Sequence, residues 1–339
     1  MSKKGILLIN LGTPEHHEPA SVYRFLKEFL NDPRVIDIPP LLRWLLVNGI
    51  IIPWRYKKSA AAYQQIWLAS GSPLLVYSQE LTKKLANELG KDYQVALGMR
   101  YGKPNIEMAL NQLSDCHQIV VLPLFPQYSS AATGSAIEKA LSVLSKRWNM
   151  PEIFIKRDFY NEAGFIQAYA EVIKKNMGSQ LIELLLFSYH GLPERHIHKS
   201  QCKAQCDRHS ECPVIHDDSQ FCYRAQCYET SRLIANALGL EENRYQVAFQ
   251  SRLGRTPWIK PYTDLLLPQL IQQGIRHIAI VCPSFVSDCL ETLEEINIRA
   301  REQWRQLGGK TFISIPCLNA HEGWTKTLAD WVRKIGLLR

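Results

Sequence analysis

The sequence has no apolar run of the roughly 20 residues that a membrane-spanning helix needs, and its amino end lacks the pattern of an export signal. We therefore expect a cytoplasmic protein. It also lacks a concentrated charge, because its formal net charge of +8 is not gathered in a tail or a basic stripe that would predict nucleic-acid binding. With 46% hydrophobic and 21% charged residues in a chain of 339, the composition is that of a globular protein large enough for two domains.

The sequence does contain a shorter apolar stretch at residues 38–60, which ends in a basic cluster. Its prolines and the interruptions at Arg43 and Asn48 make it too short to cross a bilayer. Two interpretations stay open. The stretch is either a core helix with its loop, or an exposed apolar lip that makes peripheral contact with a membrane or receives a flat apolar ligand.

The two halves of the sequence resemble each other. The paired stretches are "GILLINLGTP" (5–14) with "LLLFSYHGLP" (184–193), "YQVALGMRYGKP" (93–104) with "YQVAFQSRLGRTP" (245–257), "HQIVVLPLFPQYSS" (117–130) with "RHIAIVCPSFVSDC" (276–289), and 154–173 with 312–332. In each half, four short Val/Ile/Leu-rich runs alternate with segments of helical periodicity, which predicts βαβ units and a parallel sheet.

The repeat predicts an α/β fold of two similar doubly wound domains, Rossmann-like or flavodoxin-like, each with a parallel four-stranded sheet. We place the first domain at 1–160, with the lip at 38–60, and the second at 161–339, with a cysteine-rich insert at about 196–227. The final helix is expected to pack back on the first domain. In such sheets, ligands bind beyond the carboxyl ends of the strands.

Candidate reactive groups follow the strands of the second half. His190 comes at the end of "LLLFSYH", and Gly191 and Pro193 mark a turn there rather than the interior of an element. Glu291 follows another strand in "SDCLETLEE", where two interpretations stay open. Asp288 and Glu291 have the spacing of a capping box, but Asp288, Glu291 and Glu295 also share a helix face and could form a path for a cation or a proton.

Other strand ends carry polar groups suited to carboxylates on an otherwise apolar ligand. They include Arg100, Tyr128 and Ser129. Each of them taken alone is as compatible with a solvated loop as with a binding site.

Seven ordered motifs together resemble the ferrochelatase family, whose members insert ferrous iron into protoporphyrin IX in the last step of haem synthesis. They are "LINLGTPE" (8–15), "GSPLL" (71–75), "GMRYGKP" (98–104), "FPQYSSAATGS" (125–135), "SYHGLPER" (188–195), "FQSRLGRTPW" (249–258) and "SDCLETLEE" (287–295). The resemblance covers nearly the whole chain and implies a chelatase-like fold of two similar α/β domains.

The resemblance also implies roles for individual residues. His190 and Glu291 are then the catalytic pair that faces the incoming Fe²⁺, with Glu294 and Glu295 continuing a cation path. The implied contacts of the porphyrin are Arg100, Tyr128, Ser129, Leu45 and Trp54. Metallation must remove two pyrrole protons while Fe²⁺ loses its waters, and an imidazole and a carboxylate can share these tasks in either order.

The cysteines are concentrated in the insert. Five of the nine fall in 202–227, with the spacing C-x3-C-x5-C-x9-C-x4-C, which lacks the paired CxxC of a zinc knuckle. Some bacterial ferrochelatases hold a [2Fe–2S] cluster on such an insert, and the implied ligands here are Cys202, Cys206, Cys212 and Cys222. Cys227 begins the predicted next helix and is the alternative ligand. A zinc ion or no metal at all stays open.

Rival functions are weaker. A coproporphyrin III ferrochelatase or another tetrapyrrole metal chelatase would use similar groups, and a haem or porphyrin carrier would lack turnover. A zinc-dependent nucleic-acid module is disfavoured by the cysteine spacing. A hydrolase using Ser188 and His190 has no orienting acid. One departure from some relatives is Cys289, which stands where they carry a histidine.

Overall fold

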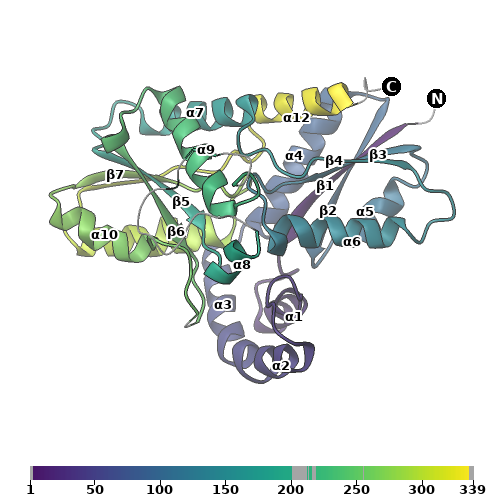
Figure 1. Ribbon diagram of the computed structural model, residues 1–339, viewed down its shortest axis with the longest axis horizontal. Helices are drawn as coiled ribbons and strands as arrows, with labels where there is room; N and C mark the ends of the chain where they lie inside the picture. The colour runs from purple at the N-terminus through teal and green to yellow at the C-terminus, as the bar shows by residue number, and fades with distance from the viewer. Residues whose placement is uncertain (1–2, 201–211, 213, 216–218, 255, 336–339) are drawn as a thin grey trace. The chain divides into compact units, whose positions relative to one another are not determined.

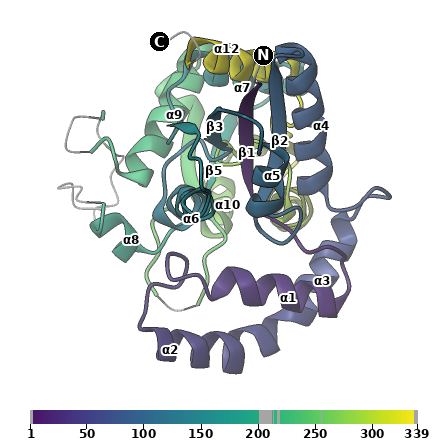
Figure 2. The same ribbon diagram turned by 90° about the vertical axis from the view of Figure 1, so that its right-hand side faces the viewer.

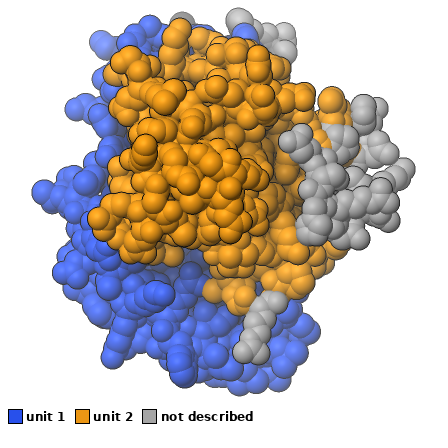
Figure 3. All heavy atoms as spheres, turned by 90° about the vertical axis from the view of Figure 1, so that its left-hand side faces the viewer, with its two compact units in different colours: residues 1–125, 129–158, 319–339 blue, residues 126–128, 159–318 orange. Residues whose placement is uncertain are grey.

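The computed structural model describes residues 3–200, 212, 214–215, 219–254 and 256–335. The chain divides into two compact units, shown in Figure 3. Unit 1 comprises residues 1–125, 129–158 and 319–339, and unit 2 comprises residues 126–128 and 159–318. Each unit is described by itself below.

Each unit is built on one four-stranded parallel sheet (Figure 1). In unit 1 the strands lie in the order β2-β1-β3-β4, and in unit 2 in the order β6-β5-β7-β8. Their bounds are β1 (Lys4–Gly12), β2 (Tyr93–Tyr101), β3 (Gln118–Pro123), β4 (Glu152–Ile155), β5 (Leu184–His190), β6 (Tyr245–Gln250), β7 (His277–Val281) and β8 (Thr311–Ser314). The same strand order in both units confirms the predicted pair of doubly wound α/β folds.

In unit 1, helices cover both faces of the sheet, because the central run Ile6–Ile9 of β1 is apolar and buried on both faces. The helical elements are α1 (Pro19–Leu30), α2 (Pro40–Leu45), η1 (Leu46–Ile51), α3 (Ile52–Ile66), α4 (Pro73–Leu89), α5 (Ile106–Gln112), η2 (Ser130–Gly134), α6 (Ser135–Leu144) and α12 (Glu322–Ile335). Helices α5 and α6 close one core with Leu7, Ile9 and Val121 of the sheet. Helix α12 packs on α4.

The segment from α1 to α3 forms a helical group of unit 1 that Figure 2 shows from the side. Helix α1 packs on α3 and η1, and its buried residues include Val22, Phe25 and Leu26. Helices α2 and α3 are joined through η1, a π-helical turn. Helix α2 differs from α1, because none of its six residues is buried. The predicted lip is therefore a helical segment with an exposed apolar side.

In unit 2, helices again lie on the faces of the sheet. They are α7 (Ala163–Met177), α8 (Glu194–His198), α9 (Tyr223–Leu238), η3 (Glu242–Arg244), α10 (Thr263–Gln272), η4 (Glu291–Ala300) and α11 (Arg301–Gln306). One core joins Leu186 and Ile280 of the sheet to Leu267, Ile296 and Trp304. Helix α9 begins at Tyr223, earlier than the sequence indicated, and Cys227 therefore lies inside it.

Among the helices that the structure describes, every one is too short or too polar to traverse a bilayer.

Candidate active site

His190 is the last residue of β5, at the carboxyl end of the sheet of unit 2. The next residue must be glycine, because a Cβ at position 191 would lie 2.9 Å from the carbonyl oxygen of Gln250. The Gly191 amide instead donates to that oxygen at 2.8 Å. The chain thus leaves the sheet tightly against β6, and the half-buried His190 side chain stands at the strand end.

The imidazole of His190 is oriented by its own turn. Its Nδ1 lies 2.6 Å from the carbonyl oxygen of Gly191. A carbonyl oxygen can only accept, so in the neutral ring Nδ1 carries the hydrogen and Nε2 carries the lone pair. The rings of Trp258 and Phe285 lie 6.4 Å and 6.2 Å from the imidazole centre. Within the described residues Nε2 has no hydrogen-bond partner, so it can accept a proton or bind a metal.

Both backbone groups of His190 are also held. Its amide donates to the hydroxyl of Ser284 at 3.0 Å, and its carbonyl oxygen accepts from the hydroxyl of Tyr223 at 2.8 Å. Tyr223 is the first residue of α9 and is buried. Burial is the largest cause that raises the pKa of this phenol well above its usual value, followed by the neighbouring Cys227. The phenol therefore stays a donor across the physiological range of pH.

Gln250 joins the His190 strand end to the start of η4. Its Nε2 donates to the backbone carbonyl of Glu291 at 2.9 Å, while its Oε1 accepts from the Ser188 hydroxyl at 2.6 Å. Ser188 in turn lies 2.8 Å from the hydroxyl of Thr263. Since Gln250 is buried and pairs in register with His190 across β5 and β6, it fixes both residues of the predicted pair to one framework.

Glu291 opens η4, a π-helix of ten residues, and its side chain is half-buried. The local bonds that the sequence assigned to a capping box involve Thr292 instead. Its hydroxyl accepts from the Cys289 amide at 3.0 Å and donates to the Asp288 carboxylate at 2.9 Å. Glu291 is therefore not required to cap the helix. Burial, followed by the nearby charge of Glu291, raises the pKa of the Cys289 thiol well above its usual value.

The other two acids of η4 are already engaged. Glu295 accepts from the amide and the hydroxyl of Ser251 at 2.9 Å and 2.5 Å. Ser251 has a φ of 66°, which a non-glycine residue adopts only when its surroundings hold it there. Glu294 is buried and accepts from Nε of Arg299 at 2.8 Å. Both carboxylates thus also serve the structure of unit 2.

Arg100 lies in unit 1, at the end of β2, and is bound to a buried acid. Its Nη2 lies 2.6 Å from the carboxylate of Asp32, and its Nε donates to the Ser135 hydroxyl at 2.7 Å. The same carboxylate accepts from Tyr101 at 2.8 Å. Burial raises the pKa of Asp32, but the bonds from Ser135, the Arg34 amide and Tyr101 outweigh it, and the pKa is lowered. This network holds the guanidinium in place.

The other predicted porphyrin contacts differ in their hydrogen bonds and in their exposure. The hydroxyl of Ser129 caps η2 by accepting from the Ala132 amide at 3.2 Å. The amide of Tyr128, a residue of unit 2, donates to Gln226 at 2.7 Å. On the helical segment of unit 1, Leu45 is 50% exposed and Trp54 is 86% exposed, which is far more than core residues show.

The cysteine-rich insert is described only in part. Cys202 and Cys206 lie outside the described residues, whereas Cys212, Cys222 and Cys227 are buried. Cys222 stands at the N-cap of α9, and Nη1 of Arg224 donates to the Cys212 sulfur at 2.8 Å. Burial raises the pKa of Cys227, and the neighbouring Cys222 and Cys212 raise it further. In the parts of the chain that the structure describes, no three His, Cys, Asp or Glu side chains are placed to hold a metal ion.

Sequence reasoning missed Gln250, Tyr223 and Ser284, which fix the backbone on either side of the predicted pair. A signal for Gln250 was present, because "VAFQ" ends another apolar run of the same half of the sequence as "FSYH". The polar residues at strand ends of one sheet face the same edge. Tyr223 gave no comparable signal, since it lies in the cysteine-rich stretch.

Known proteins match the chain over nearly all of its length. The family model described as Ferrochelatase matches residues 3–335. A protein named Ferrochelatase from Legionella pneumophila (strain Paris) is 55% identical over 332 residues, covering 98% of this chain and 99% of the relative. Its namesake from Coxiella burnetii (strain Dugway 5J108-111) is 51% identical over 336 residues, covering 98% and 94%.

Two solved structures share the fold. SirB from Bacillus subtilis with Fe³⁺ superposes with a TM-score of 0.53 at 13% identity, covering 99% of this chain and 96% of that structure. CbiX, described as the terminal enzyme for biosynthesis of sirohaem in denitrifying bacteria, gives 0.50 at 10% identity, covering 97% and 98%. These likenesses concern the fold alone, whereas the matches over the full sequence establish the family: the chain belongs to the ferrochelatases.

Proposed function

We propose that the protein inserts Fe²⁺ into protoporphyrin IX, with His190 and Glu291 as its catalytic residues. Ferrochelatase activity, the final step of haem biosynthesis, follows from membership of the family. The assignment of the residues rests chiefly on one observation. His190 commits Nδ1 to the Gly191 carbonyl and so presents the lone pair of Nε2 at a strand end.

In the proposed reaction, Nε2 of His190 accepts a proton from a pyrrole nitrogen of the porphyrin. The aromatic rings of Trp258 and Phe285 lie beside this imidazole. Glu291 receives Fe²⁺, because a carboxylate is a suitable ligand for a hydrated divalent cation and can replace its waters. Gln250 pairs with His190 across β5 and β6, and its side chain binds the backbone carbonyl of Glu291. It therefore links both residues to the same edge of the sheet.

The activity is tested with purified protein, Fe²⁺ and porphyrin under anaerobic conditions, by following the haem spectrum. Protoporphyrin IX and coproporphyrin III are compared at matched concentrations. A higher kcat/KM for coproporphyrin III would overturn the choice of substrate. Binding of porphyrin without turnover would favour the carrier instead.

We also propose that the exposed side of the helical segment 38–60 contacts the apolar surface of the porphyrin and makes peripheral contact with a membrane. Leu41, Leu45 and Trp54 are 71%, 50% and 86% exposed. A contiguous group of exposed apolar side chains usually marks a surface that binds a ligand, a protein or a membrane. Arg100 and Ser129 of unit 1 and Tyr128 of unit 2 are proposed as contacts of the porphyrin's propionates or edge.

Replacing Leu45 and Trp54 together with serine should raise the KM for porphyrin about tenfold or more, because apolar contact is lost. The melting temperature should hardly change, since both side chains are already exposed. The same variant should sediment less with anionic phospholipid vesicles. The matched control is Trp148→Ser, which removes a side chain that is 97% exposed elsewhere in unit 1. A large fall in melting temperature at unchanged KM would assign the segment to the core.

For the insert we propose a [2Fe–2S] cluster held by Cys202, Cys206, Cys212 and Cys222. The chemistry of the described donors fits this set in part. The Arg224 guanidinium bonded to the Cys212 sulfur would stabilise a thiolate, the form that binds metals. Cys227 fits less well, because burial raises its pKa and favours the neutral thiol. When bound, such a cluster supplies one-electron redox chemistry.

Protein purified without air should therefore be reddish and contain about two irons and two sulfides per chain. Cys212→Ser should bleach the absorption, whereas Cys227→Ser should bleach it less. Elemental analysis and the visible spectrum provide the measurement. Colourless protein with one zinc per chain would contradict the cluster and leave the ferrochelatase assignment in place.

A further inference from the structure

The backbone of His190 is held on both sides by buried or neighbouring side chains of unit 2. Its amide donates to the Ser284 hydroxyl, and its carbonyl accepts from the Tyr223 hydroxyl, at 3.0 Å and 2.8 Å. Both hydroxyls come from residues distant in the sequence, so they fix the strand end from outside its own turn.

The phenol belongs to the start of α9. Tyr223 is the first residue of that helix, and Cys222, one residue before it, is the N-cap. The start of α9 therefore carries the donor to the His190 carbonyl.

We infer that Tyr223 is a positioning residue for His190, and that through it the start of α9 sets the orientation of the imidazole. The Gly191 carbonyl that accepts from Nδ1 belongs to the peptide after Gly191, so its place depends on the peptide before it, between His190 and Gly191. That preceding peptide is held at its carbonyl by Tyr223 and at its amide by the carbonyl oxygen of Gln250. Without the Tyr223 hydroxyl only the amide bond remains, and the peptide can tilt about it. Nδ1 then loses its fixed acceptor, and the hydrogen is shared between the two nitrogens. This inference rests on the proposed role of His190 as proton acceptor.

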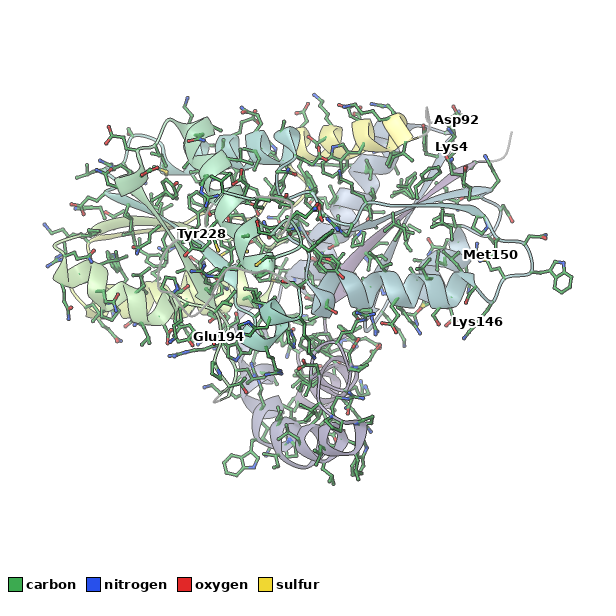
Figure 4. All side chains as sticks on the ribbon, in the orientation of Figure 1. Lys4, Asp92, Lys146, Met150, Glu194 and Tyr228 are labelled. Carbon is green, nitrogen blue, oxygen red and sulfur yellow. The ribbon has the colours of Figure 1, made fainter. Side chains whose placement is uncertain are left out.

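The test compares two tyrosines of one helix. Tyr223→Phe should lower kcat about 10- to 100-fold through misplacement of the base, with the KM for porphyrin within twofold of wild type. Tyr228→Phe is the matched control, since it removes a hydroxyl further along α9 that accepts from Arg224 at 3.2 Å; Figure 4 labels Tyr228. This control should keep kcat within twofold.

A second readout does not depend on turnover. In ¹⁵N-histidine NMR, with the His190 signals assigned by His190→Gln, wild type should show the Nδ1–H tautomer. Tyr223→Phe should show a mixture of tautomers. Ser284→Ala, which releases the amide of His190, should produce the same mixture and serves if Tyr223→Phe does not fold. An unchanged tautomer and kcat in these variants would overturn the inference. If wild type carries the hydrogen on Nε2, the proposed role of His190 fails instead.

Discussion

His190→Ala should reduce kcat for Fe²⁺ insertion about 100- to 10,000-fold, which is the range for loss of a positioned base. Porphyrin should still bind, because the substitution removes the imidazole but none of the exposed apolar side chains of unit 1. The bonds of the His190 amide and carbonyl come from the backbone and persist in alanine. Haem formation measured anaerobically, together with porphyrin fluorescence titration, separates loss of chemistry from loss of binding.

The matched control is His277→Ala. His277 opens β7 at the other end of the same sheet, and its Nδ1 lies 2.8 Å from the Thr311 hydroxyl. The control loses an imidazole and its hydrogen bond at a distance from the strand ends, so kcat should stay within twofold. Turnover of His190→Ala within tenfold of wild type would remove His190 from the mechanism.

The sequence predicted the fold well because the features that determine it are repeated and local. Four apolar runs in each half alternate with helical periods, and the parallel pairing then follows from the connections. His190 could be placed for the same reason, since the end of a buried parallel strand is a defined position in such a sheet. The two observed four-stranded parallel sheets and the last residue of β5 agree with these predictions.

Contacts between distant side chains could not be predicted in this way. The bond from Tyr223 to His190 joins residues 33 apart, and that from Gln250 to Glu291 joins residues 41 apart. Neither leaves a periodic pattern in the sequence. The capping box is an instructive case, because Glu291 had the right spacing while Thr292, one residue later, makes the local bonds. Several geometries satisfy one spacing, and packing chooses among them.

Because Thr292 rather than Glu291 makes the local bonds, Glu291→Gln should affect activity far more than stability. The substitution keeps the shape of the side chain, and Gln250 binds the backbone carbonyl of residue 291, so this link survives. Thr292 continues to bond Cys289 and Asp288. The free energy of unfolding should therefore change by less than about 1 kcal/mol. The negative charge that receives Fe²⁺ is lost, and kcat/KM for Fe²⁺ should fall about 100-fold or more.

Two further variants make the interpretation of Glu291→Gln unambiguous. Glu291→Asp keeps the charge on a shorter side chain and should recover part of the activity, whereas a purely steric role would be served better by glutamine. Glu302→Gln removes a carboxylate that pairs with Arg305 on the surface of α11, and it should leave kcat/KM for Fe²⁺ unchanged. Initial rates at varied Fe²⁺ and thermal unfolding of each variant provide the comparison. Should Glu291→Gln unfold the protein while its specific activity stays intact, Glu291 supports the helix, and the cation must be received by another group of unit 2.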